Sequence, residues 1–95
     1  MDQTQAITLQ VPGVLRIHSD GASRLAVSAP DVRGVLVELE QRFPGLHRNL
    51  CDETGKVRPH LNVYVNSEDV RFLNGLDTRL AAGDVVIILP AVSGG

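Results

Sequence analysis

The sequence predicts one α+β domain, in which a mixed sheet of four to five strands carries one main helix on one face. Its 95 residues suit a single domain. Residues 6–11 and 61–66 alternate apolar and polar side chains, and one long helical stripe lies between these two segments. Residues 85–89 are apolar on both faces, which is typical of a strand at the centre of a sheet.

The N-terminal part predicts two strands. Residues 6–11 alternate apolar and polar side chains, as a half-buried strand does. Pro12-Gly13 predicts a turn. A second strand is expected to start at residues 14–17, to pause in a loop at 18–21 and to resume at 23–27.

The main helix is predicted to follow Asp31, whose carboxylate can accept a hydrogen bond from a first-turn N–H. Its apolar stripe is Val32, Val35, Leu36, Leu39 and Phe43. Pro44-Gly45 should stop the helix, since proline cannot continue it and glycine suits the exit turn.

Residues 46–59 predict an irregular segment with one short helical turn at 46–50. Residues 61–66 alternate again and predict a strand. The side chains that we expect to point inward from it are Leu61, Val63 and Val65.

A turn is predicted at residues 67–69 and a short edge strand at 70–72. Residues 73–80 should connect to the final strand through one helical turn capped by Asp77, and Gly83-Asp84 should form a tight turn. This order of elements, with the last strand running into the sheet centre, gives a β-grasp arrangement, which by propensity alone is one of several α+β options.

The final strand also predicts a docking surface. If Val86 and Ile88 face the helix, then Ile87 and Leu89 point outward from a sheet face that no second helix covers. Outward apolar side chains in such a place suggest a partner surface. The alternative is that irregular segments cover that face.

Composition excludes several classes of function. Net charge is −2 and aromatic residues make up 3%, so the chain lacks the basic stripe and the stacking platforms of nucleic-acid-binding proteins. No apolar run approaches the ~20 residues that span a membrane, and the N-terminus does not resemble a signal peptide. We therefore expect a cytoplasmic protein with neither nucleic-acid nor membrane partners.

No side-chain constellation of an enzyme is evident. Cys51 is the single cysteine, and its acidic neighbours Asp52 and Glu53 should raise its thiol pKa, so a semi-buried loop cysteine is expected. The three histidines, His18, His47 and His60, lack metal-site spacing. We predict a protein that is not an enzyme and that binds no metal or cofactor.

The tail carries a more specific signal. The chain ends Ile88-Leu89-Pro90-Ala91-Val92-Ser93-Gly94-Gly95, directly after the predicted central strand. This ending resembles that of the ThiS/MoaD family of ubiquitin-like sulfur carriers, and residues 65–84 resemble the block that precedes the tail in MoaD-like members. The longer N-terminal half and the stretch 62–66 are most similar to the CysO-type carriers of cysteine biosynthesis.

The resemblance implies a function for Gly95. An E1-like adenylating enzyme of the MoeB/ThiF type would use ATP to join the Gly95 carboxylate to AMP, and a sulfur donor would then convert it to a thiocarboxylate. In the CysO-type branch, the sulfur acceptor is a pyridoxal-phosphate-dependent cysteine synthase. A JAMM-type metalloprotease then releases cysteine from the carrier.

The residues of the tail suit this chemistry. Gly94 and Gly95 have no Cβ, so they can enter a narrow channel. Pro90 should end the sheet pairing, so that residues 1–90 form the domain and 91–95 a flexible tail. The residues expected to be recognised by partners are Pro90, Ala91, Val92, Ser93 and Gly94. Arg71 and Phe72 could add to a partner interface, although packing explains them nearly as well.

Two other functions begin with the same tail. The chain could be a MoaD-like small subunit bound to the large subunit of molybdopterin synthase. It could also be a ubiquitin-like modifier conjugated through Gly95, in which case Lys56, the only lysine, is the one side-chain amine for self-polymerisation. The sequence leaves the final sulfur acceptor, the sulfur donor and the oligomeric state open.

Overall fold

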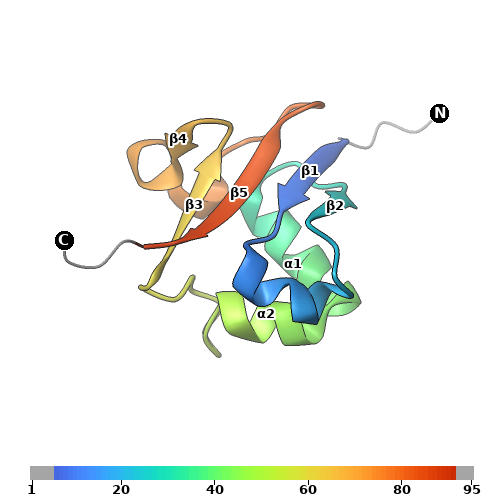
Figure 1. The fold of residues 1–95 in the computed structure, drawn as a ribbon. Coiled ribbons are helices and arrows are strands. Elements are labelled where there is room, and N and C mark those ends of the chain that lie inside the picture. The colour runs from blue at the N-terminus through green and yellow to red at the C-terminus, as the bar shows by residue number, and fades with distance from the viewer. Residues whose placement is uncertain (1–5, 92–95) are drawn as a thin grey trace.

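The computed structural model describes residues 6–91 and contains a five-stranded sheet in the order β2-β1-β5-β3-β4 (Figure 1). The strands are β1 Ile7–Gln10, β2 Arg24–Val27, β3 Leu61–Val65, β4 Glu68–Asp69 and β5 Val85–Pro90. The central strand β5 pairs in parallel with β1 and antiparallel with β3. The predicted β-grasp arrangement, with the last strand at the sheet centre, is confirmed.

The main helix, α1 (Val32–Arg42), packs its predicted stripe against the sheet. Its fully or nearly fully buried side chains are Val32, Val35, Leu36 and Leu39. Each such side chain stabilises the fold by roughly 1.5–3 kcal/mol through burial. The predicted cap is also confirmed, because the Gly34 N–H donates a 2.8 Å hydrogen bond to Asp31 Oδ1.

A second helix, α2 (Pro44–Leu50), follows α1 directly, and both lie on the same side of the sheet (Figure 1). The helical turn expected at 46–50 is confirmed, but the helix is longer than expected because it begins at Pro44. Pro44 ends α1 but occupies the first turn of α2, where its missing N–H costs nothing. Leu46 and Leu50 of α2 are fully buried and enlarge the core.

The predicted strand at residues 14–17 does not form. Residues Gly13–Ser19 instead form a 3-10 helix, η1, that begins after Pro12. The Leu15 N–H bonds to the Pro12 carbonyl at 2.9 Å, which is the short-range pattern of such a helix. The buried Ser19 hydroxyl donates to the Ala22 carbonyl at 2.8 Å, and this bond holds the return to β2. Alternation of apolar residues was therefore misleading here, because Val14 and Ile17 are exposed.

The edge strand β4 also differs from the prediction. Strand pairing occurs at Glu68–Asp69, where a turn was expected, and residues Val70–Phe72 form a 3-10 turn, η2, instead of an edge strand. The Asp69 carboxylate accepts a 2.8 Å hydrogen bond from the Arg71 N–H. This capping bond favours a turn after Asp69 over continued pairing.

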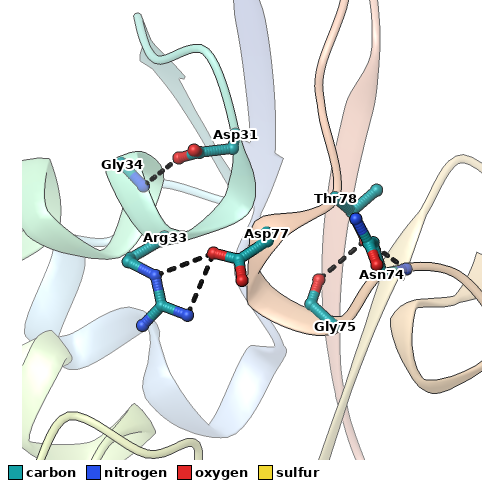
Figure 2. Close-up of polar contacts among 7 residues, drawn as sticks. All are labelled: Asp31, Arg33, Gly34, Asn74, Gly75, Asp77 and Thr78. Carbon is teal, nitrogen blue, oxygen red and sulfur yellow. Dashed lines mark hydrogen bonds and ion pairs between the residues drawn. The ribbon is translucent and has the colours of Figure 1, made fainter.

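A 3-10 turn, η3 (Gly75–Asp77), ties the chain before β5 to the start of α1 (Figure 2). Asp77 does not cap this turn, as was expected, but is its last residue. Its carboxylate instead accepts from Arg33 of α1 at 3.1 Å. Thr78 Oγ1 bonds to the Gly75 carbonyl at 2.7 Å and accepts from the Asn74 N–H at 3.0 Å.

The core lies between the sheet and the two α-helices. The strand residues predicted to point inward, Leu61, Val63 and Val65, are buried there. No helix among residues 6–91 is long and apolar enough to cross a membrane. The predicted boundary between a domain at 1–90 and a tail at 91–95 stays a prediction, since residues 92–95 lie outside the described part of the chain.

Candidate functional site

The root of the tail is held by His60, the residue directly before strand β3. The Ala91 N–H donates a 2.7 Å hydrogen bond to the His60 carbonyl, one residue beyond the end of β5. The expectation that Pro90 ends the sheet pairing was therefore wrong on this side. Backbone N–H groups point alternately to the two sides of a strand. Because the Ala91 N–H points toward His60, the nitrogen of Pro90, which carries no hydrogen, points away from β3.

On the other side of β5, two prolines end the parallel pairing. The last rung joins Gln10 of β1 to Ile87 of β5. In the hydrogen-bond pattern of a parallel strand pair, the next two N–H donors would belong to residues 12 and 90. Both residues are proline and have no N–H. The register between β1 and β5 accordingly ends at this rung.

Four predicted site residues, Val92, Ser93, Gly94 and Gly95, lie outside the described residues. The two others of the tail are Pro90, which is exposed at the end of β5, and Ala91, which is half-buried. The roles of all six residues in partner recognition stay predictions.

The outward orientation of the predicted docking residues on β5 is confirmed. Val86 and Ile88 are buried against the helices, whereas Ile87 is half-buried on the opposite face and Leu89 is 44% exposed. The cross-strand neighbour of Ile87 on β3 is Tyr64. Among residues 6–91, no helix lies on this face of the sheet (Figure 1).

Arg71 and Phe72 lie on η2, which directly follows the edge strand β4. The Phe72 ring is 82% exposed. Arg71 donates to both carboxylate oxygens of Asp69, at 3.2 and 2.8 Å. These bonds lower the pKa of Asp69 and raise that of Arg71, so the pair stays charged at neutral pH.

Tyr64 connects the two predicted docking regions. It is the cross-strand partner of Ile87 on one side and of Asp69 on the other. Sequence reasoning did not single it out, although it is the only tyrosine and alternates with the buried residues of β3. The structure therefore places Ile87, Tyr64 and the Asp69–Arg71 pair in one row across the sheet.

A groove of about 500 Å³ opens where β1 and β5 separate. Its lining is Gln10, Val11, Pro12, Gly13, Val14, Arg16, Ser23, Arg24, Ile87, Ile88, Leu89 and Pro90. Both charged residues of this lining are arginines. Sequence reasoning missed this groove because it assigned residues 14–17 to a strand. The signal that could have found it is Pro12-Gly13, which disfavours pairing immediately before these residues.

Cys51 does not have the environment of a reactive thiolate. Its side chain is buried at the end of α2, and burial, followed by the charge of Asp52, raises its thiol pKa to about 11. This confirms the expected direction, with burial as the larger cause. Among residues 6–91, no group of three or more His, Cys, Asp or Glu side chains could hold a metal ion.

Comparison with known proteins supports one family. The model of the ThiS family matches residues 9–95. The sulfur carrier protein CysO of Mycobacterium tuberculosis is 42% identical over 91 residues, which cover 94% of this chain and 98% of that protein.

Solved structures give the same result. CysO in the BexX/CysO complex of Amycolatopsis orientalis is similar to this chain with a TM-score of 0.84 and 39% identity, over 95% of this chain and 100% of that one. The small archaeal modifier protein 1 of Methanosarcina acetivorans is similar with a TM-score of 0.81 and 29% identity, over 99% and 100% of the two chains.

Proposed function

The chain belongs to the ThiS family, and from this premise we propose that it is a sulfur carrier whose working group is the Gly95 carboxylate. The observation that carries the proposal is the family match, which runs to Gly95 and includes the whole ending after β5. The root of that ending is fixed by the bond between Ala91 and His60. Four further residues lead from this bond to the carboxylate.

The chemistry proceeds in two substitutions. The Gly95 carboxylate, ionised at neutral pH because an α-carboxyl has a pKa of ~3.3–3.7, attacks the α-phosphorus of ATP and releases pyrophosphate. A sulfur nucleophile then attacks the acyl carbon of the adenylate, and AMP leaves. The product is a terminal thiocarboxylate, with sulfur in place of one carboxylate oxygen.

The chain acts as a co-substrate and not as a catalyst. Rate enhancement in both steps requires groups that position ATP and stabilise the developing charge. We assign those groups to an E1-like adenylating enzyme of the MoeB/ThiF type. ATP is then a substrate of the partner, and the reaction belongs in the cytoplasm, where ATP is available.

We assign the transferred sulfur to cysteine biosynthesis, because the relatives that are 42% identical over 94% of this chain are named CysO. The acceptor would be a pyridoxal-phosphate-dependent cysteine synthase, followed by a JAMM-type metalloprotease that releases cysteine. The BexX/CysO complex supports a carrier that docks on separate enzymes.

Intact-mass spectrometry tests the carrier function. The purified chain is incubated with ATP, its adenylating enzyme and sulfide, and we expect a mass gain of one sulfur-for-oxygen exchange at Gly95. A variant lacking Gly95 and a variant extended by one leucine should fold normally but gain no sulfur. Sulfur gain by the variant lacking Gly95 would refute the proposal.

The second candidate function is protein modification. It is favoured by the similarity to the archaeal modifier protein, which covers almost the whole chain. In that case Gly95 forms an isopeptide bond with a lysine of a target protein. Lys56 is exposed and is the only lysine of this chain, so a Lys56→Arg variant should abolish any self-conjugate of its side chains. Isopeptide-linked targets in cell extracts would favour this function, and a free thiocarboxylate would favour the carrier.

A further inference from the structure

The 3-10 helix η1 presents two apolar side chains to solvent beside the root of the tail. Val14 is 76% exposed and Ile17 is 81% exposed. Side chains three residues apart on a 3-10 helix lie on the same edge, so these two form one continuous apolar ridge. Val14 also lines the groove at the end of β5, opposite Leu89 and Pro90 of that strand.

The groove is cationic as well as apolar. Its charged lining residues are Arg16 and Arg24, in a chain whose net charge is −2. Arg16 Nε donates to the Val11 carbonyl at 3.0 Å, which fixes this guanidinium at the groove. Among residues 6–91, neither arginine has an acidic side chain as an ion-pair partner. Within the described residues, no acidic side chain therefore neutralises this charge, which favours an acidic group on the surface that docks here.

The length of the tail determines what lies against this groove. Only four residues separate Ala91 from the Gly95 carboxylate, so that carboxylate reaches at most about 14 Å from Ala91. An enzyme that encloses Gly95 in its active site must therefore also touch the surface around the end of β5. The groove and the ridge on η1 are part of that surface.

The need to select this chain among other proteins indicates which enzyme binds this surface. Every protein ends in a carboxylate, and the last two residues of this tail offer no side chain to recognise. The adenylating enzyme must therefore choose its substrate by contacts with the folded domain. An enzyme that accepts sulfur can instead select the thiocarboxylate, which is chemically rare.

We propose that the ridge of Val14 and Ile17, with the arginine-lined groove beside it, is the docking surface for the adenylating enzyme. The matching surface of that enzyme is an apolar element flanked by acidic side chains. This inference rests on the proposed carrier function and adds the part of the domain that selects the activating partner.

The test measures adenylation kinetics by ATP–pyrophosphate exchange with the purified adenylating enzyme. A Val14→Ser/Ile17→Ser double variant should raise the KM for the carrier at least tenfold and leave kcat nearly unchanged, because the carboxylate chemistry is intact. Arg24→Glu should also raise KM, and added salt should reduce the difference between Arg24→Glu and the wild type. The matched control is Val37→Ser, an exposed apolar residue on α1, which should leave KM unchanged.

Circular dichroism should show that all variants are folded. If the wild type is adenylated and the double variant has the same KM, the inference is overturned and the carrier function stands. If KM increases for Phe72→Ser but not for the double variant, the docking site lies on η2, and the inference is again overturned. If the wild type is not adenylated, the carrier function fails, and the inference fails with it.

Discussion

The backbone N–H of Ala91 bonds to the carbonyl of His60 at 2.7 Å, so the residue directly before β3 holds the chain one residue beyond the last residue of β5. On the opposite side of β5, Pro12 and Pro90 remove the donors that would have continued the pairing with β1. The tail therefore leaves the sheet held along one edge only. This pairing on one side only fixes the residue at which the chain leaves the sheet, and it leaves the groove beside η1 open.

Loss of the hydrogen bond between Ala91 and His60 should lower both the free energy of unfolding and the rate of sulfur loading. An Ala91→Pro substitution removes the donor to His60 and should lower the free energy of unfolding by about 0.5–1.5 kcal/mol. It should also slow thiocarboxylate formation, because the direction of the tail is no longer fixed. Urea denaturation and the mass assay measure the two effects. Ala91→Ser keeps the N–H and is the control, so equal stability of the two variants would contradict the role of this bond.

A substitution at Gly34 should separate helix propensity from packing. Alanine is favoured over glycine by about 1 kcal/mol inside a helix, so the sequence alone suggests that Gly34→Ala stabilises α1. A Cβ at Gly34 would lie 2.9 Å from the Ala29 Cβ and 3.3 Å from the Pro30 Cδ. We expect Gly34→Ala to destabilise the fold by about 1–3 kcal/mol, measured by chemical denaturation.

The control for Gly34 is Gly13, where a Cβ would meet nothing within 4 Å. Gly13→Ala should leave the free energy of unfolding nearly unchanged. A stable Gly34→Ala variant would show that the turn at Ala29 and Pro30 can shift at little cost.

The ion pair between Asp69 and Arg71 predicts a stability change in acid. The hydrogen bonds from Arg71 hold the pKa of Asp69 below its usual value of 3.8. Stability from this pair is therefore present above about pH 4 and is lost as the pH falls through the lowered pKa. At pH 7, Asp69→Asn should be less stable than the wild type by about 0.2–1 kcal/mol.

Denaturation curves between pH 7 and pH 2 test this effect. The difference between Asp69→Asn and the wild type should shrink below about pH 4. Glu68→Gln removes a carboxylate from the same strand, outside the ion pairs of the described residues, and is the matched control. A difference that stays constant with pH would show that the substitution acts through packing.

The buried thiol of Cys51 predicts a stability change in base. Its pKa is about 11 in the folded state and 9.0 for an ordinary thiol. The unfolded chain loses the proton first, so the stability due to the neutral thiol is present below about pH 9 and is lost as the pH rises to 11. The free energy of unfolding of a Cys51→Ala variant should therefore fall less between pH 9 and pH 11 than that of the wild type. Denaturation at pH 8 to 11 measures the difference.

The same burial should protect Cys51 from alkylation. We expect iodoacetamide to label it slowly in the native protein at pH 8 and rapidly in urea. Cys51→Ala should still gain sulfur at Gly95, and its failure to do so while folded would indicate a part for the thiol in loading.

Predictions from the sequence were right where a local signal, such as a cap or a residue spacing, agreed with the burial of the element. The Asp31 cap, the stripe of α1 and the inward side of β3 all follow from residue spacing, and the structure has all three. The predictions failed where a local bond opposed the pattern. Residues 14–17 look like a strand, but the chain turns after Pro12, and residues 70–72 turn because Asp69 binds the Arg71 N–H.

The docking residues show the same division. Ile87 and Leu89 could be assigned to the outer face from strand alternation alone. The groove beside them could not, because it depends on where two strands distant in sequence separate. Tyr64 joins Ile87 to the Asp69–Arg71 pair only through the register of β3 with β5 and β4.

By itself, the sequence determined the class of fold, the central position of the last strand and the Gly-Gly ending, because periodicity and motif are local properties of a chain. Only the tertiary structure decided that Val14 and Ile17 lie exposed beside the end of β5, that His60 holds Ala91, and that a Cβ at Gly34 would collide with Ala29. The first two depend on the distance between segments far apart along the chain, which is set by strand register and by packing of the core. The third depends on how closely the turn at Ala29 and Pro30 approaches the first turn of α1.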